Sequence, residues 1–473
     1  MKLRFIEKMR VKPTGSVYGA LLGACQVHGN VELGERSAYK LFELEPENAA
    51  NYVILSNIYA SAGRWDYAGR IRKLMVVKGL SKDVGYACLR INLTHIDSEL
   101  NLTKSEILER AIRRTKHKIM SLASTETQIQ TPLMFSSNSY SMDFSIGSPS
   151  VPLTWLMDTG SNLIWTDCKT SFNPSNSSTF TKLPCTNPLC QSLPFRPTCA
   201  PDCDYTYSYV DNLTVQGVLA SETFAFGSNS PVSVPGIGFG CNMRSRGLLP
   251  NAAGLAGLAR GKLSLVSQLG ATKFSYCLTS YGESKSSPLL LGSSAILSGS
   301  VQSTPFVTNP NRPVLYYLSL KGISVGSKLL AIDSSVFALD SDGNGGFVID
   351  SGTTVTYLNN KGYQVMKQEF EAQVNLSVAD SSATLFDLCF SLPSDQNAAV
   401  IVPELVFHFE GADMQIPGTN YFTGVSNTNL LCLAILPTDG ISTLGNFQQQ
   451  NMHILYDVGA EKLSFVQAQC DQV

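Results

Sequence analysis

Two segments of the chain follow one pattern, in which an apolar run leads into Asp, then Thr or Ser, Gly, and Ser or Thr. The first is TWLMDTGSNLIW, which contains Asp158, and the second is GFVIDSGTTVTYL, which contains Asp350. Glycine makes up about 7% of average sequences, so one such tetrad is uncommon by chance and two behind strand-like runs are rarer still. The two aspartates are therefore the candidate catalytic groups.

The chemistry that suits two aspartates is hydrolysis without a metal ion or a covalent nucleophile. One group must take a proton from water, and another must give a proton to the carbonyl oxygen under attack. Two carboxylates held close together cannot both ionise, so such a pair keeps one shared proton and supplies both groups. Glycine permits the tight turn that exposes each carboxylate, and nearby hydroxyls can donate hydrogen bonds to it. The expected supporting residues are Thr159, Gly160, Ser161, Ser351, Gly352 and Thr353.

Other sequence patterns are weaker evidence for a catalytic or binding site. The two tetrads could be ordinary turns at strand ends, which is the plain alternative. Gly322-Ile323-Ser324-Val325-Gly326 fits the Gly-x-Ser-x-Gly pattern of serine hydrolases, but it lies between strand-like runs and not at a strand-to-helix turn. The five histidines are scattered, and no phosphate-binding glycine loop is present. We therefore expect no metal and no cofactor.

The elements that must position the aspartates are strands. From about residue 123 to the end, short alternating or apolar runs are separated by Gly, Ser, Pro and Asn, a pattern typical of an all-β region. Residues 16–80 instead show apolar residues at i, i+3 and i+4 in four segments, which predict two helical hairpins. A basic helix is expected from Ser105 to Leu122, with the basic residues Arg110, Arg113, Arg114, Lys116 and Lys118.

Composition indicates a globular protein with more than one domain, since 44% of the 473 residues are hydrophobic and 15% are charged. The net charge of -2 hides a split, because residues 1–120 are net positive and residues 121–473 net negative. The basic part could therefore lie across the acidic part or contact an anionic polymer, although two solvated surfaces are the simpler interpretation.

Cysteines indicate disulfides and an oxidising compartment. Ten of the 12 fall in the β region, with neither a Cys-x-x-Cys pair nor a Cys/His cluster. The amino terminus lacks the apolar core and cleavage site of a signal peptide, and no apolar run is long enough to span a membrane. The disulfide candidates are Cys168, Cys185, Cys190, Cys199, Cys203, Cys241, Cys277, Cys389, Cys432 and Cys470.

Residues 89–473 resemble the pepsin-like aspartic proteases of the plant nepenthesin type. Besides the tetrads, the resemblance rests on AAGLAGLARGKLSLVSQLG, KFSYCL, YYLSLKGISVGSKLL and STLGNFQQQNMHILYD. It implies a mainly β, bilobal acid protease fold with lobes at 131–310 and 311–473, and loops that brace the catalytic turns at 255–257 and 443–445. It also implies that residues 89–130 form an inhibitory prosegment whose basic side chains cover the acidic cleft.

The resemblance further implies a β-hairpin flap over the cleft, with Tyr209 near its tip and Trp165 as its hydrogen-bonding neighbour. The flap departs from the family pattern, because Val210, Asn212 and Leu213 stand where two glycines and a serine are usual. Asn212 thereby becomes a glycosylation candidate, as are Asn176 and Asn375. About ten residues with two cysteines are missing after Trp165, so Cys168 is expected to lack its usual partner or to pair differently.

Residues 10–88 resemble the C-terminal extension of plant pentatricopeptide-repeat proteins, from SVYGALLGACQVHGNVELGE through LEPENAANYVILSNIYASAGRW. The chain thus joins an all-α helical-hairpin fragment, 1–88, to a protease, either as a genuine fusion or through merged gene models. We expect a monomeric aspartic endopeptidase with an acid pH optimum that acts on proteins or peptides and binds its own prosegment, without a nucleic-acid partner. The family resemblance implies a secreted or vacuolar protein. Two alternatives remain, a catalytically impaired inhibitor-like protein and an RNA-processing accessory that acts through the helices.

Overall fold

The structure is a computed structural model that describes residues 14–28, 30–46, 48–62, 64–78, 89–98, 100–120, 140–194, 198–199, 201–208, 214–227, 231–246, 251–283, 285–393 and 400–473. The chain divides into two compact units, Met1–Gly85 and Tyr86–Val473. Within the described residues, no helix is long and apolar enough to cross a membrane.

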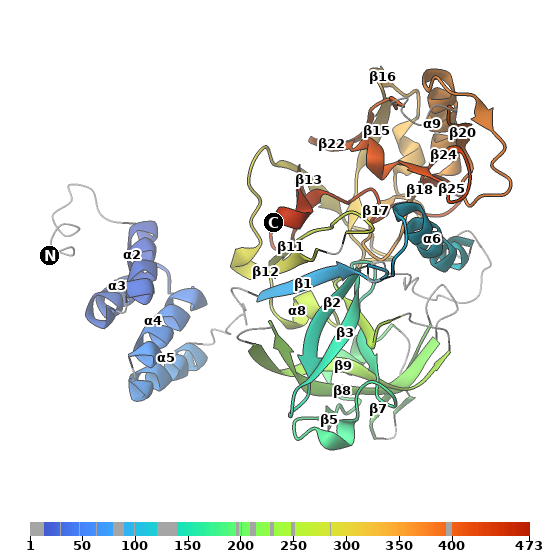
Figure 1. The fold of residues 1–473 in the computed structure, drawn as a ribbon. Helices are drawn as coiled ribbons and strands as arrows, with labels where there is room; N and C mark the ends of the chain where they lie inside the picture. The colour runs from blue at the N-terminus through green and yellow to red at the C-terminus, as the bar shows by residue number, and fades with distance from the viewer. Residues whose placement is uncertain are drawn as a thin grey trace. The chain divides into compact units, whose positions relative to one another are not determined.

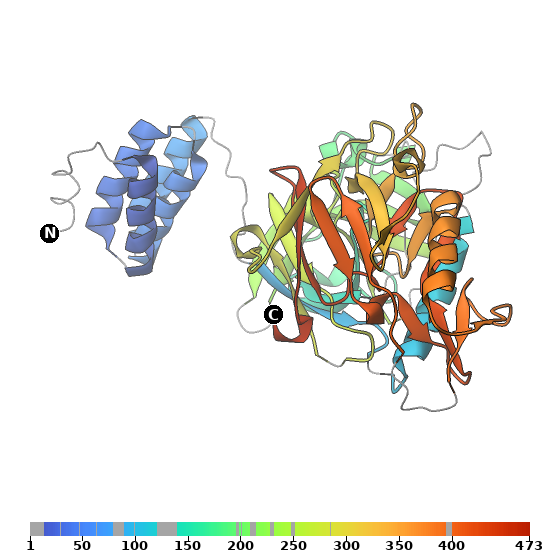
Figure 2. The same cartoon turned by 90° about the horizontal axis from the view of Figure 1, so that it is seen from above.

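The first unit is made of helices whose apolar faces meet. They are α2 (Gly15–His28), α3 (Val31–Leu44), α4 (Ala49–Ser61) and α5 (Trp65–Val77). Helix α3 begins where the side chain of Asn30 accepts a hydrogen bond from the Leu33 amide, which satisfies one amide of its first turn. Phe42 of α3 stacks on Tyr52 of α4 at 3.7 Å between ring centroids, within a core that also buries Leu22 and Leu55. Figure 2 shows the four helices packed side by side, as the helical spacing predicts.

The second unit consists mainly of strands. Its helices are α6 (Lys104–Met120), α7 (Pro188–Gln191), α8 (Leu265–Gln268) and α9 (Asn360–Gln373). Its strands up to residue 307 are β1 (Leu89–His95), β2 (Tyr140–Ile146), β3 (Val151–Asp158), β4 (Ile164–Asp167), β5 (Thr181–Lys182), β6 (Thr198–Cys199), β7 (Cys203–Ser208), β8 (Thr214–Phe226), β9 (Val232–Arg246), β10 (Gly254–Gly257), β11 (Lys273–Cys277), β12 (Ser287–Leu291) and β13 (Gln302–Val307).

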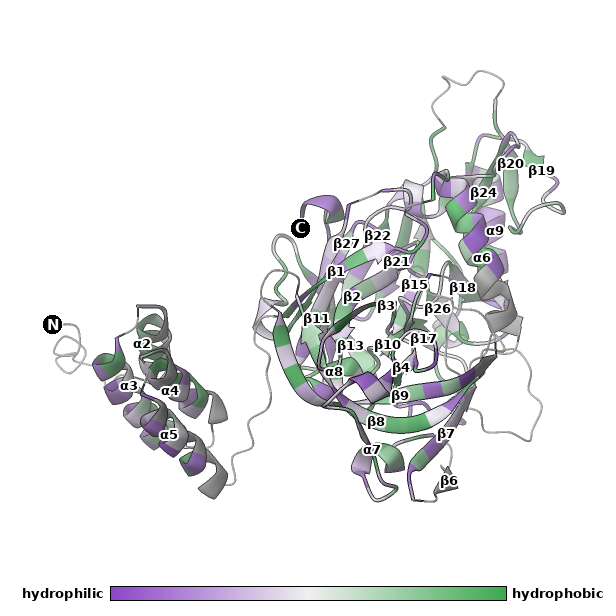
Figure 3. Cartoon of the chain, turned by 60° about the horizontal axis from the view of Figure 1, so that its bottom comes forward, coloured by the Kyte–Doolittle hydropathy of each residue, from purple (hydrophilic) through white to green (hydrophobic). Residues whose placement is uncertain are grey.

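The later strands are β14 (Tyr317–Leu318), β15 (Leu320–Val325), β16 (Lys328–Leu329), β17 (Phe347–Ile349), β18 (Thr356–Asn359), β19 (Val378–Ala379), β20 (Cys389–Ser391), β21 (Leu405–Phe409), β22 (Ala412–Ile416), β23 (Phe422–Gly424), β24 (Leu430–Leu433), β25 (Ile435–Thr438), β26 (Ser442–Leu444), β27 (Met452–Asp457) and β28 (Lys462–Gln467). Figure 3 shows hydrophobic and hydrophilic bands along β8, which is buried on both faces at 218–220 and 224–226.

One antiparallel sheet joins the two halves of this unit. Its strands run in the order β2, β1, β12, β11, β27, β28 and β13. Strand β1, drawn in blue in Figure 1, therefore lies inside the sheet although it precedes both lobes in the chain. Its side chains explain this position, because Leu89, Ile91 and Leu93 are buried while Arg90 and Asn92 are exposed. This strand was not predicted within residues 89–130, where only a helix was expected.

On either side of the joining sheet, the two lobes repeat one arrangement of three strands. In the first lobe, β10 pairs in parallel with β3 and antiparallel with β4. In the second, β26 pairs in parallel with β17 and antiparallel with β18. The prediction of a mainly β, bilobal fold with helices in the N-terminal region is confirmed, and the repeated strands place one catalytic candidate in each lobe.

Candidate active site

Asp158 and Asp350 occupy equivalent positions in the two lobes. Asp158 is the last residue of β3, and Asp350 directly follows β17. Both side chains are buried, with at most 1% of either residue exposed. Each preceding strand is buried over its last three residues, since it pairs on both sides with other strands. The apolar runs noticed in the sequence are thus the buried strands that carry the two aspartates.

The two turns that follow the aspartates bond directly to each other. The Thr159 amide donates to the Ser351 hydroxyl at 3.1 Å, and the Ser351 amide donates to the Thr159 hydroxyl at 2.9 Å. Because all four groups are buried and the bonds are reciprocal, neither turn can shift without leaving a polar group of the other unsatisfied. The sequence placed these residues 192 positions apart, and the fold joins them at the interface between the lobes.

Each carboxylate is held by its own glycine. The Gly160 amide donates to Asp158 Oδ1 at 2.9 Å, and the Gly352 amide donates to Asp350 Oδ1 at 2.8 Å. These bonds close a tight turn around each aspartate and orient its carboxylate. The last residues of the two tetrads, Ser161 and Thr353, differ from each other in their hydrogen bonds.

Thr353 and Ser161 were both expected to tune the pair through their hydroxyls. The Thr353 hydroxyl donates to Asp350 Oδ2 at 2.6 Å. The Ser161 hydroxyl is buried, but it has no hydrogen-bond partner among the described residues. The expected hydroxyl bond to the carboxylate is therefore present in the Asp350 turn. In the Asp158 turn, Ser161 does not provide it.

A bracing loop runs behind each turn. In the first lobe, Leu258 donates from its amide to the Asp158 carbonyl at 2.7 Å, and Ala259 donates to the Ser161 carbonyl at 3.0 Å. In the second, Asn446 donates to the Thr353 carbonyl at 2.7 Å, and Phe447 donates to the Thr354 carbonyl at 2.9 Å. These loops follow the segments 255–257 and 443–445, which the sequence predicts to brace the turns.

The flap is described only at its base. Strands β7 and β8 form the hairpin, while Tyr209 and Asn212 lie outside the described residues. Trp165 is buried in a cluster with Tyr205 and Tyr207. Burial and the charge of Asp158 raise the pKa of Tyr207, so this tyrosine approaches the first aspartate from the hairpin. Sequence reasoning missed Tyr207, because β7 carries two buried tyrosines, Tyr205 and Tyr207, and nothing in the sequence singles one out.

Helix α6 packs on the rest of the second unit mainly through apolar and neutral groups. Ile107, Leu108, Ala111 and Ile112 are at most 1% exposed. The Ala111 carbonyl accepts a bond of 3.2 Å from the hydroxyl of Thr354, the residue after the second tetrad. A stripe of apolar residues at helical spacing thus packs this helix against the rest of the unit. That basic side chains of the helix cover the cleft stays a prediction.

The structure describes the side chains of only some basic residues of α6. Arg110 lies 3.8 Å from Asp97 of the same segment, and Arg113 is exposed. The side chains of Arg114, Lys116 and Lys118 lie outside the described part of the chain. Lys104, at the start of the helix, donates to the Thr419 carbonyl at 3.0 Å and lies over the Phe447 ring.

Four disulfides join described cysteines. They are Cys168–Cys241, Cys190–Cys203, Cys277–Cys470 and Cys389–Cys432. Cys185 is also disulfide-bonded, and the side chain of Cys199 lies outside the described residues. Cys168 pairs with Cys241 despite the missing segment, because β4 runs in parallel beside β9 and sets the two residues 5.3 Å apart at their Cα atoms. The glycosylation candidates Asn176 and Asn375 are exposed.

Ser324 of the Gly-x-Ser-x-Gly pattern contacts a histidine and an aspartate. Its hydroxyl lies 2.7 Å from His408 Nε2, and His408 Nδ1 lies 2.7 Å from Asp413 Oδ1. The serine lies within β15, whose backbone is paired with β16 and β21 on either side. A serine hydrolase needs free amides to stabilise an oxyanion beside the serine, and this paired strand leaves none there. Among the described residues, no group of three or more His, Cys, Asp or Glu could hold a metal ion.

Comparison with known proteins identifies both lobes. The family model described as "Xylanase inhibitor N-terminal" matches residues 140–293, and "Xylanase inhibitor C-terminal" matches residues 315–467. A third model, "E motif", matches residues 28–89 in the helical part.

The chain is 46% identical over 400 residues to aspartic proteinase nepenthesin-1 of Nepenthes gracilis, a match that covers 80% of this chain and 90% of the relative. It is 42% identical over 400 residues to nepenthesin-2 of the same plant, over 81% and 90%, and 34% identical over 419 residues to aspartyl protease family protein 2 of Arabidopsis thaliana, over 81% and 85%.

Solved structures share the fold. The crystal structure of edgp matches with a TM-score of 0.62 and 20% identity, over 82% of this chain and 96% of that one. Basic 7S globulin from soybean matches with a TM-score of 0.61 and 18% identity, over 81% and 97%. These likenesses concern the fold, whereas the sequence matches establish kinship: the chain belongs to the family of plant pepsin-like aspartic proteases that includes the nepenthesins.

Proposed function

We propose that this chain is an aspartic endopeptidase in which Asp158 and Asp350 hydrolyse peptide bonds together. The observation that carries the proposal is the reciprocal pair of hydrogen bonds between Thr159 and Ser351, the residues that follow the aspartates. Two turns joined in this way hold their carboxylates at one interface, where a water molecule can lie between them. The sequence relatives named aspartic proteinases support the same activity.

The reaction needs both protonation states of the pair. The ionised carboxylate takes a proton from water as the water oxygen attacks the peptide carbonyl carbon, and the protonated carboxyl gives its proton to the carbonyl oxygen. Collapse of the tetrahedral intermediate then breaks the C–N bond as the nitrogen receives a proton. Since the shared proton is lost when both carboxylates ionise, activity is present in acid and falls as pH rises.

Residues 89–120 act in this proposal as part of an inhibitory prosegment. Strand β1 completes the sheet between the lobes, and α6 bonds to Thr354 beside the second turn. The apolar contacts of Ile107, Leu108 and Ile112 stabilise this position. Cleavage after α6 would release the helix and expose the surface that it covers.

The test is hydrolysis of a denatured protein substrate from acid to neutral pH, with pepstatin and an Asp158→Asn variant as controls. The protein is used after its prosegment has been removed. Cleavage that is confined to acid pH, blocked by pepstatin and absent from the variant supports the proposal. A flat pH profile, or cleavage that persists in the variant, contradicts it.

The disulfides support an oxidising compartment, so we place the protease in the secretory pathway, either secreted or vacuolar. Exposed Asn176 and Asn375 are then glycosylation sites, which a shift in mass after treatment with a glycosidase would detect. The helical unit is proposed as a fragment of a pentatricopeptide-repeat protein that takes no part in proteolysis. Activity that changes on deletion of residues 1–85 would contradict this separation.

The second candidate is a non-catalytic, inhibitor-like protein, favoured by the family models described as xylanase inhibitor. The intact aspartates and their glycine bonds argue against it. The same hydrolysis experiment separates the two, because folded protein without its prosegment that cleaves nothing at any pH, while binding a xylanase, supports the inhibitor.

A further inference from the structure

Gln449 is a fully buried amide behind the second catalytic turn. It lies between β26 and β27, in a stretch where Gln448, Gln449 and Gln450 are all 0% exposed. A buried amide is costly unless its groups are hydrogen-bonded. Gln449 Nε2 donates to the Leu444 carbonyl at 2.8 Å and to the carbonyl of Asp350 itself at 3.3 Å. The amide therefore holds the main chain of a candidate catalytic residue.

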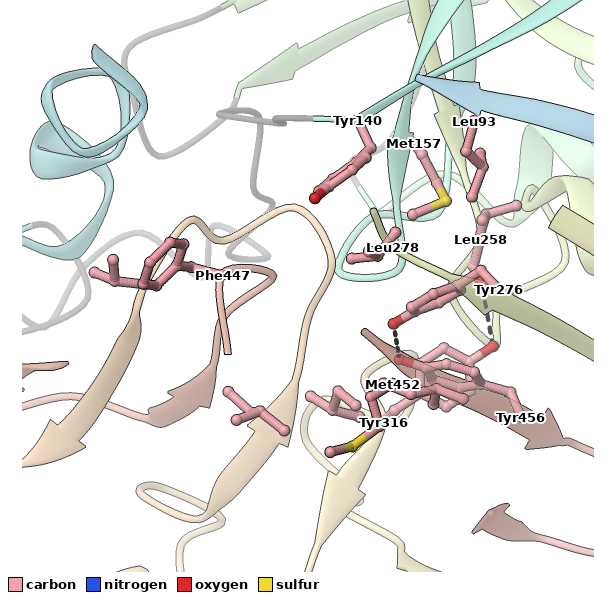
Figure 4. Close-up of a cluster of buried hydrophobic side chains, with 14 of the residues drawn as sticks. Leu93, Tyr140, Met157, Leu258, Tyr276, Leu278, Tyr316, Phe447, Met452 and Tyr456 are labelled. Atoms are coloured by element: carbon pink, nitrogen blue, oxygen red, sulfur yellow. Dashed lines mark hydrogen bonds between the residues drawn. The ribbon is translucent and has the colours of Figure 1, made fainter. Parts of the chain in front are cut away.

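The other end of the Gln449 amide reaches the sheet that joins the lobes. Its Oε1 accepts a bond of 2.6 Å from the Tyr276 hydroxyl of β11. Tyr276 bonds in turn to the Tyr456 hydroxyl of β27 at 2.8 Å, as the dashed line in Figure 4 shows. Thr159 of the first turn also influences the pKa of Tyr456, so the two side chains lie near each other. Burial raises the pKa of both tyrosines, so their hydroxyls keep their protons at acid and neutral pH.

These bonds form a path between the two lobes. The path runs from the Asp350 carbonyl through the Gln449, Tyr276 and Tyr456 side chains, and Tyr276 belongs to the first lobe. The first turn has a related support, because the Tyr316 hydroxyl donates to the Leu258 carbonyl at 2.9 Å and the Leu258 amide bonds to Asp158. Figure 4 shows Tyr276, Tyr316 and Tyr456 close to one another.

We propose that Gln449 is a positioning residue for the catalytic pair, which fixes the Asp350 turn relative to the Asp158 turn through the two tyrosines. This inference rests on the proposed protease function and adds a residue that does not touch the substrate. A misplacement of about 1 Å at a catalytic group can cost about 100-fold in rate, so loss of one buried anchor should appear in kcat. The path crosses from one lobe to the other, so its loss should alter how the two carboxylates share a proton.

The adjacent Gln448 provides a matched control. It is equally buried and also takes part in three hydrogen bonds, accepting from the Thr356 amide and donating to the carbonyls of Asn420 and Ala434. All of its partners lie in the second lobe, and none is an aspartate of the pair. A Gln→Met change removes the same groups at either position, so both variants should lose similar stability while only one disturbs the path.

The experiment compares Gln449→Met, Gln449→Glu and Gln448→Met by kcat, KM, the pH profile of kcat and the thermal midpoint. We expect Gln449→Met to lower kcat by about 10- to 100-fold with KM nearly unchanged and to move the profile along the pH axis. Gln448→Met should match its thermal midpoint but keep kcat within about 3-fold. Gln449→Glu should recover most of kcat in acid, where the neutral carboxyl retains one donor and one acceptor, and lose it as pH rises.

A milder pair of changes covers the case in which a methionine variant fails to fold. Tyr276→Phe removes the hydroxyl that joins Gln449 to Tyr456, and Tyr421→Phe removes a buried hydroxyl that bonds to the Pro403 carbonyl away from the path. We expect a loss of about 3- to 10-fold in kcat for the first and none for the second. Equal kcat within both pairs would overturn the role of Gln449. If the Asp158→Asn variant cleaved the substrate as fast as the wild-type protein does, the proposed function would be overturned instead.

Discussion

The turns at Asp158 and Asp350 share a backbone and differ in their side chains. In both, a glycine amide holds Oδ1 of the aspartate, and a loop later in the same lobe donates hydrogen bonds to carbonyls of the turn. In the second turn, the hydroxyl of Thr353 also donates to Oδ2 of its aspartate. In the first turn, the hydroxyl of Ser161 has no partner in the described part of the chain. The shared backbone sets where the carboxylates lie, while the side chains give each one a different environment.

That difference matters because the reaction needs an acid and a base from two identical groups. A hydrogen bond donated to a carboxylate favours its ionised form, so unequal donors push two carboxylates toward unequal roles. The hydroxyl of Thr353 therefore supports Asp350 by a bond that Ser161 does not provide in the first turn. The variants below first test the backbone support that both turns share, and then the difference between Ser161 and Thr353.

Among the residues that support the two aspartates, the largest effect is expected from the glycines that let the bracing loops approach the turns. A Cβ atom at Gly257 would lie 2.5 Å from the Ser161 carbonyl oxygen, and one at Gly445 would lie 2.4 Å from the Val355 carbonyl carbon. Backbone must move in either case, so Gly257→Ala and Gly445→Ala should each lower kcat by about 100-fold or more.

Gly322→Ala is the control for these two variants, since its nearest neighbour is the end of the exposed Leu329 side chain, 3.2 Å away. Activity measured on a denatured protein in acid should be unchanged in this variant. If only one of the two loop variants lost activity, the turns would not share a common support.

The next effect separates the tetrads. Thr353→Val keeps the shape of the side chain but removes the donor to Asp350, and a hydrogen bond to a charged group contributes about 1.5–3 kcal/mol. We expect kcat to fall by about 10- to 100-fold, whereas Ser161→Ala should stay within about 3-fold because that hydroxyl holds no described partner. Thr353→Ser keeps the donor and serves as the control. A Ser161→Ala loss as large as that of Thr353→Val would show that the two turns are equivalent.

The smallest effect concerns the sheet that joins the two lobes. His453 of β27 is buried with Nε2 at 3.1 Å from the Ser275 hydroxyl of β11, and burial lowers its pKa. Below about pH 6.5 the unfolded chain binds a proton at this histidine that the folded chain still refuses, so stability falls as pH falls through that window.

Urea unfolding at a series of pH values should show a shallower acid decline in His453→Gln than in the parent. His408→Gln changes a partly exposed histidine at the surface of the second lobe and is the comparison variant. The same acid decline in the parent and in His453→Gln would exclude His453 as its source.

The sequence sufficed to locate both turns and the mainly β fold, because these depend on local patterns: buried runs, a glycine after each aspartate and short strands between turn residues. The prediction of a bilobal fold is confirmed. The roles of the aspartates and of their neighbours stay predictions until activity is measured. The four helices of the first unit followed from apolar spacing in the same way.

The rest depended on pairing between distant segments. Strand β1 has clear alternation at Leu89, Ile91 and Leu93, yet its partner β12 lies about two hundred residues later, so only the fold shows it to be part of the joining sheet. Gln449 lies in the segment STLGNFQQQNMHILYD, but no role was predicted for it. Nothing in the local sequence indicates that its amide forms hydrogen bonds with Asp350 and Tyr276. The unequal support by Ser161 and Thr353 was also hidden, since both residues carry a hydroxyl at the same place in the tetrad.

The most direct test of the account is a double-mutant cycle on the aspartates. Asp158→Asn, Asp350→Asn and the double variant are compared by kcat on one substrate at the acid optimum, with folding checked by circular dichroism. Residues that act as one unit give non-additive losses, so each single variant should lose about 10⁴-fold or more and the double variant little beyond that. Single losses that multiply in the double variant, or a single variant that keeps most of its activity, would contradict a catalytic pair built from both lobes.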